Sequence, residues 1–82
     1  MKIQGFKFVP AEISIPAGTT VKWTNLDSVS HTVTSTSAPA GGEFGTNTLG
    51  NGESGSVVFN TAGTYDYKCS IHPNMKGKII VG

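Results

Sequence analysis

The seven residues from Cys69 to Met75 hold three side chains that bind soft metal ions, spaced three residues apart. Their sequence is Cys-Ser-Ile-His-Pro-Asn-Met, so a thiol, an imidazole and a thioether share one short segment. The whole chain has one cysteine, two histidines and two methionines, and the other histidine is His31. Two histidines, one cysteine and a distant axial methionine form the ligand set of electron-transfer copper sites. We therefore predict a copper site built from His31, Cys69, His72 and Met75.

Other chemistries fit these side chains less well. Taken singly, each would pass for a core or surface residue, and only their conjunction indicates a site. A structural zinc site draws its four ligands from Cys, His and carboxylates, whereas the fourth candidate here is a thioether. A thiol enzyme would need a base for Cys69 and a third group to orient that base. The nearest carboxylate in sequence, Asp66, faces the opposite side of its predicted strand. The residues therefore favour a metal-binding protein over an enzyme.

Composition narrows the remaining classes of function. The 82 residues carry a net charge of +1 and no basic run, which argues against a nucleic-acid partner. No apolar stretch approaches the roughly 18 residues that a membrane span needs, and the first eight residues lack the apolar core of a signal peptide. We expect one copper-binding domain over residues 1–82. A chain this short has a marginal core, so a bound metal would add to its stability.

The pattern of apolar residues predicts an all-β protein. No 3.6-residue period persists, whereas short alternating segments are separated by Gly, Pro and Asn. The predicted strands are residues 2–8, 12–15, 19–25, 30–35, 54–60, 64–69 and 77–81. Residues 36–53, rich in Gly, Ser, Thr and Asn, form a long connection with room for one short strand. Seven to eight strands of this kind predict a Greek-key β-sandwich.

Alternation along these strands predicts where the ligands point. Tyr65, Tyr67 and Cys69 are in phase and should face the core, and His31 is in phase with Val33. By the same rule Phe6 and Phe8 should share one face of residues 2–8. Two ligands would then arrive at strand ends, with residues 70–75 folded over them.

The chain also resembles the cupredoxin (blue copper) family, most closely its amicyanin-like and plastocyanin-like members. The resemblance is strongest over Thr61–Val81, which contains Thr-Ala-Gly-Thr-Tyr-Asp-Tyr-Lys-Cys-Ser-Ile-His-Pro-Asn-Met, and it continues in Val21–Asn25 and His31–Val33. It implies a cupredoxin-like sandwich that binds one copper ion. It also implies a one-electron shuttle that uses the Cu(II)/Cu(I) couple and is not itself an enzyme.

Carried over to this sequence, the resemblance implies roles for the residues around the ligands. His72 corresponds to the partly exposed histidine through which family members pass electrons, so the electron-transfer surface would comprise Ile71, His72, Pro73 and Asn74. Ser30, Thr32 and Ser70 would support the ligands from outside. Two positions depart from the family pattern: Thr32 stands where Asn is frequent, so its tie to Ser70 would be made by a hydroxyl, and Ser30 replaces the usual Pro or Gly.

Partners and location follow from the same resemblance. It implies redox proteins as electron donor and acceptor, a monomer, and an extracytoplasmic (periplasmic or secreted) location. Two alternatives stay open: a copper carrier or sensor, and a copper domain cut from a larger oxidase. Because the net charge is near zero and the sequence contains no patch of a single sign, we expect electron exchange to depend only weakly on salt, unless folding gathers Lys68, Lys76 and Lys78 into one patch.

Overall fold

Eight strands and no helix make up the computed structural model, which describes residues 1–82. The strands are β1 (Lys2–Ile3), β2 (Phe8–Val9), β3 (Glu12–Ile15), β4 (Thr19–Asn25), β5 (Thr34–Ser37), β6 (Ser54–Phe59), β7 (Gly63–Lys68) and β8 (Lys76–Val81). The fold contains no helix with the length and hydropathy needed to cross a bilayer.

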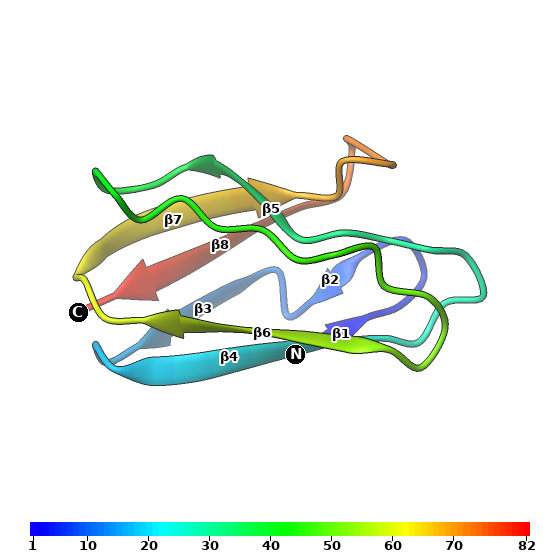
Figure 1. Cartoon of the computed structure of the whole chain (residues 1–82), viewed down its shortest axis with the longest axis horizontal. Helices are drawn as coiled ribbons and strands as arrows, with labels where there is room; N and C mark the ends of the chain where they lie inside the picture. Colours follow the sequence, from blue (N-terminus) through cyan, green and yellow to red (C-terminus); the bar gives the residue numbers. More distant parts are fainter.

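The strands form two four-stranded sheets (Figure 1). One sheet has the order β2-β1-β4-β6 and the other β3-β8-β7-β5. The pairs β1·β4 and β3·β8 are parallel and all others antiparallel. Because β3 and β5 lie in one sheet and β4 and β6 in the other, the chain crosses repeatedly between the sheets. The prediction of an all-β sandwich with seven to eight strands is confirmed.

The core lies between the sheets and is built largely from aromatic side chains. Trp23 of β4 is fully buried and contacts Tyr67 at a ring-centroid distance of 5.4 Å. Tyr65, Tyr67 and Cys69 are 2%, 1% and 0% exposed, which confirms that alternating residues of β7 face inward. Because this strand is anchored by two buried rings, the position of Cys69 at its end is well determined.

The first predicted strand is wrong, because residues 2–8 form two short strands joined by a tight turn. Gly5 and Phe6 both adopt left-handed backbone conformations, with φ of 64° and 57°. Two such residues in succession reverse the chain direction. As a result Phe8 is 3% exposed while Phe6 is 51% exposed, and the two rings do not share a face.

The strand predicted at residues 30–35 is displaced, since β5 begins only at Thr34. His31 pairs instead with Leu49 in an isolated bridge, and Thr34 pairs with Gly45. The connection over residues 36–53 therefore contains two single bridges in addition to the end of β5, with no strand of its own. His31 and Val33 are both fully buried, as predicted, but Thr32 between them is also only 7% exposed. Their burial comes from this covering connection and not from strand alternation.

The connections that matter for function meet at one end of the sandwich. The segment after β7 and the connection between β4 and β5 lie together at the end away from the C-terminus (Figure 1). The turn between β1 and β2 reaches the same end, where Phe6 contacts the rings of His31 and His72.

Candidate metal centre

The segment from Cys69 to Met75 is a tight loop closed by its own backbone. The Cys69 N–H donates to the Met75 carbonyl at 3.0 Å, and the Met75 N–H donates to the His72 carbonyl at 3.0 Å. Cys69 is fully buried and Met75 is 4% exposed, whereas His72 is only partly buried. The loop thus holds a thiol and a thioether inside the protein and leaves the imidazole between them at the surface.

His31 is positioned by a buried asparagine that the sequence analysis did not single out. The Asn25 side-chain amide donates to the carbonyls of Val29 at 2.9 Å and Leu49 at 2.8 Å. The backbone of Leu49 in turn exchanges two hydrogen bonds with His31, at 3.0 and 2.7 Å. Because Asn25 is fully buried, this arrangement fixes the segment that carries His31.

The structure brings His31 and Cys69 into direct contact, with Nδ1 of the ring 3.6 Å from Sγ. With metal–nitrogen and metal–sulfur bonds of about 2.0 and 2.3 Å, this separation would allow one ion to bind both atoms. The rings of His31 and His72 are 5.1 Å apart, centroid to centroid. That spacing would also allow both imidazoles to bind one ion.

The pairwise spacings therefore suit a single metal ion, although the ligand set is not closed. No three His, Cys, Asp or Glu side chains converge closely enough to hold an ion as they stand. Of the three candidate ligands in the Cys69–Met75 loop, His72 alone is not buried, so it is the one that has room to move towards the others. The donor chemistry of a thiol, two imidazoles and a buried thioether is that of a copper site, and in this respect the residues fit the metal.

The surroundings of Cys69 favour its thiolate form, which is the form that binds metal. Burial by itself would raise the pKa of this thiol above its usual value of 9.0. Backbone N–H groups of Thr32 and His72, the ring of His31 and the N–H of Ile71 outweigh that effect and lower the pKa. The Thr32 N–H lies 3.4 Å from Sγ.

Asp27 contacts His31, and the sequence analysis missed this residue. Its Oδ2 lies 2.8 Å from Nε2 of His31, and its side chain is 12% exposed. A carboxylate in this position holds the proton on Nε2 and leaves Nδ1 free to bind a metal. The spacing of four residues between Asp27 and His31 was visible in the sequence, but the turn that lets them meet was not.

The same carboxylate anchors the turn between β1 and β2. Its oxygens accept hydrogen bonds from the N–H groups of Gly5 at 2.7 Å and Phe6 at 3.0 Å. Successive N–H groups in a left-handed turn form a concave binding site for an anion, and Asp27 occupies it. The turn places the Phe6 ring edge-on to His31 and His72, with centroids 5.4 and 5.1 Å away. Phe6 therefore covers both imidazoles although it is itself half exposed.

The remaining predicted site residues divide into two groups. The Thr32 hydroxyl lies 2.8 Å from the Ser70 hydroxyl and accepts a hydrogen bond from the Ser70 N–H at 2.8 Å, so hydroxyl groups join the two ligand-bearing segments. Ser30 is exposed, and its side chain makes no hydrogen bond within the protein. The predicted electron-transfer residues Ile71, Pro73 and Asn74 are all exposed and lie next to His72 in the loop.

Comparison with known proteins agrees with this fold. The sequence profile of the copper-binding proteins of the plastocyanin/azurin family matches residues 1–82. Amicyanin-alpha from Methylorubrum extorquens is 43% identical over 83 residues, which cover 99% of this chain and 69% of that protein. The chain belongs to the plastocyanin/azurin family of copper-binding proteins.

Solved structures show the same architecture in two settings. A reduced amicyanin variant superposes with a TM-score of 0.88 at 32% identity, covering 99% of this chain and 78% of that one. A copper-containing nitrite reductase from Thermus scotoductus SA-01 superposes with a TM-score of 0.92 at 36% identity. The latter match covers 99% of this chain but 21% of the reductase. Among the amicyanins matched in sequence, the chain spans between 61% and 69% of their length.

Proposed function

We propose that this protein is a one-electron carrier that holds one copper ion through His31, Cys69, His72 and Met75. The observation that carries the proposal is the contact between the His31 imidazole and the buried Cys69 sulfur, beneath a second, partly exposed imidazole. Bound copper supplies a Cu(II)/Cu(I) couple, for which this ligand set is suited.

The protein's own contribution is to keep two of the proposed ligands, Cys69 and His31, nearly fixed and away from water. Cys69 is held at the end of β7 and by the closed loop, and His31 by Asn25 and Asp27. Burial of the sulfur excludes water, and the N–H groups directed at it stabilise its negative charge. A cage that changes little between oxidation states lowers the reorganisation needed when an electron arrives. Full burial of Cys69 also favours retention of the metal over its delivery to another protein.

The exposure of the two imidazoles indicates the route of the electron. Among the two imidazoles, His31 is fully buried and His72 reaches the surface. We propose that electrons enter and leave through His72, across the surface formed by Ile71, Pro73 and Asn74. Both the electron donor and the electron acceptor would dock on this surface. The protein would act as a monomer outside the cytoplasm, as its resemblance to cupredoxins implies.

The test is a visible absorption spectrum recorded while Cu(II) is added to the purified copper-free protein. We expect an intense charge-transfer band from the thiolate at one equivalent, reversibly lost on reduction. Cys69→Ser should abolish the band, and circular dichroism should show that this variant keeps its strands. A stoichiometric complex that stays pale, or a Cys69→Ser variant that keeps the band, would show that the ligand assignment is wrong.

The match to a copper-containing nitrite reductase supports a second candidate, in which this chain is an electron-transfer domain within a larger enzyme. The chain superposes on about a fifth of that reductase with a TM-score of 0.92. In that setting the same site would deliver electrons within one polypeptide. Immunodetection of the native protein separates the candidates: a species near 8.5 kDa supports the free carrier, and a much larger one supports the domain.

A further inference from the structure

Strand pairing sorts the charges on the outer face of one sheet into two unlike rows. In the first row Lys78 of β8 lies opposite Asp66 of β7 and Glu12 of β3, so its charge alternates with theirs. In the next row, one step nearer the metal-binding loop, Lys68 lies directly opposite Lys76. No carboxylate approaches either ammonium group within 4.0 Å. Like charges directly opposite each other destabilise a sheet. The repulsion between Lys68 and Lys76 therefore destabilises the fold, and no carboxylate of the chain offsets it.

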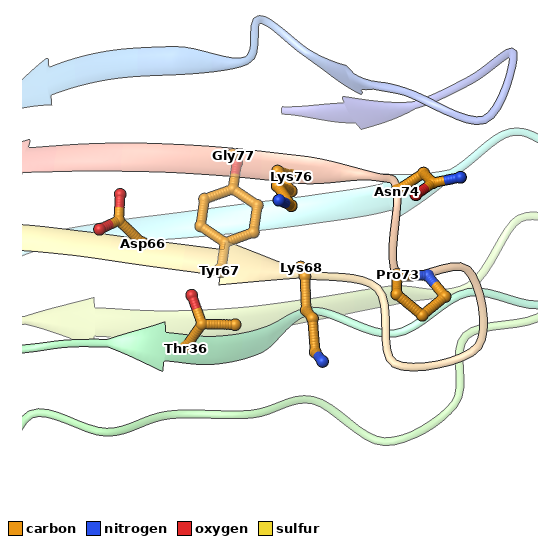
Figure 2. A pocket seen from close by; sticks show the side chains of 8 residues that line it. All are labelled: Thr36, Asp66, Tyr67, Lys68, Pro73, Asn74, Lys76 and Gly77. Carbon is orange, nitrogen blue, oxygen red and sulfur yellow. The ribbon is translucent and has the colours of Figure 1, made fainter.

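The two lysines border a groove of about 600 Å³ that runs along the sheet to the loop. Lys68 and Lys76 lie midway along it, with Asp66 towards one end and Pro73 and Asn74 at the other (Figure 2). The groove therefore joins an uncompensated double positive charge to two residues that flank His72. Only strand register creates this patch, because the lysines are eight residues apart in the sequence.

We propose that this groove, bordered by Lys68 and Lys76, docks an acidic surface of the protein that exchanges electrons with this one. The inference rests on the proposed electron-carrier function and names the chemistry of its partner. A partner carboxylate seated between the two ammonium groups would cancel their repulsion and set the partner over His72. Two lysines beside the carboxylate of Asp66 are too few for a nucleic-acid backbone, where affinity grows with the number of phosphates neutralised. If the groove docks an acidic partner, electron exchange should depend on salt, in contrast to the weak dependence that the nearly neutral sequence led us to expect.

The test is an NMR titration of the isotope-labelled Cu(I) protein with a hexa-aspartate peptide at about 10 mM salt, where charges act over roughly 30 Å. We expect amide shifts concentrated at Lys68, Asn74 and Lys76. Replacing both lysines by glutamine should weaken binding about tenfold, as should raising salt to about 150 mM. The matched control is Lys22→Gln on β4, which removes the same charge from the opposite sheet and should leave affinity unchanged within about twofold.

Shifts that map elsewhere, or a Lys22→Gln effect equal to that of the groove variants, would overturn the proposal. A hexathymidylate that binds these residues more tightly than the peptide would also overturn it, in favour of a phosphate-bearing partner. The same titration on the copper-free protein keeps this test separate from the proposed function. If the peptide binds there while copper gives no charge-transfer band, the groove stands and the electron-carrier assignment fails. If the band forms and the peptide does not bind, the electron-carrier assignment stands and the docking groove fails.

Discussion

Replacing Asp27 by asparagine removes the carboxylate that joins His31, a proposed copper ligand, to the turn between β1 and β2. The carboxylate accepts three hydrogen bonds, from the N–H groups of Gly5 and Phe6 and from Nε2 of His31. Asparagine keeps the shape but replaces one oxygen by an NH₂ group, which cannot accept. If asparagine keeps its oxygen at the position bonded to Gly5, then Phe6 and His31 lose their acceptor, and in the other orientation Gly5 loses its own.

The size of the effect follows from these contacts. A hydrogen bond to a charged group contributes about 1.5–3 kcal/mol. The Asp27 side chain is only 12% exposed, so water replaces little of the loss. We expect Asp27→Asn to lower the free energy of unfolding by about 2 kcal/mol. A domain of 82 residues has a total of roughly 4–12 kcal/mol, so the change is readily measured.

The loss should depend on pH in a defined direction. Burial alone would raise the pKa of Asp27, but hydrogen bonds from Phe6, Gly5 and His31 lower it below its usual 3.8. A depressed pKa in the folded state stabilises the protein above the unfolded value, and this contribution disappears as pH falls through the folded one. The gap between wild type and Asp27→Asn should therefore be full at about pH 7 and close below pH 3.8.

Urea unfolding of the copper-free protein, at neutral pH and in acid, measures this difference. Asp66→Asn is the matched control, because Asp66 lies on the outer face of β7 and its carboxylate makes no hydrogen bond within the protein. As a second readout, Cu(II) affinity of Asp27→Asn should fall about 10–100-fold, since the carboxylate orients a ligating ring. Equal stabilities for Asp27→Asn and Asp66→Asn at neutral pH would refute the role assigned to Asp27.

Three further predictions concern the ligands and the core. Met75→Leu should raise the reduction potential and Met75→Gln should lower it, because the axial donor favours Cu(II); unchanged voltammetric midpoints in both would exclude an axial Met75. Gly77→Ala should lower the free energy of unfolding by about 1–3 kcal/mol, because its Cβ would overlap the buried Tyr67 ring. Gly45→Ala, with its nearest contact at 3.8 Å, is the control for that urea measurement. Copper at 100 times its Kd should stabilise the protein by about 2.7 kcal/mol, and a chelator should reverse the shift in Tm.

The sequence was most informative where a ligand sits on a regular strand. Alternation placed Tyr65, Tyr67 and Cys69 on the inner face, because a period of two in a half-buried strand leaves little freedom. The three candidate ligands of the Cys-x-x-His-x-x-Met segment could likewise be recognised without knowledge of the tertiary structure. Burial of His31 was predicted for an incorrect reason, since the segment around it is not a strand.

Features that depend on distant segments could not be predicted in this way. The contact between Asp27 and His31 exists because a left-handed turn at Gly5 and Phe6 supplies two N–H groups to the same carboxylate. Nothing in the alternation of residues 2–8 indicates such a turn, and a phenylalanine with positive φ runs against local preference. The paired lysines are similar, since one residue of slip in the register of β7 and β8 would separate them.

The two imidazoles are held in very different ways, and this asymmetry has a functional reason. The ring of His31 is fixed through Asp27, and its backbone is fixed through Leu49, so it has one orientation. His72 is held by a backbone hydrogen bond from Met75 and by contact with the Phe6 edge. If both rings bind copper as we propose, the rigid His31 would keep the sulfur and one nitrogen in place during electron transfer. The looser His72, next to the proposed docking groove, would be the point where copper enters and where a docked partner affects the metal site. The Phe6 ring contacts both imidazoles and therefore limits how far the His72 ring can rotate. It does so without covering the exposed side of His72.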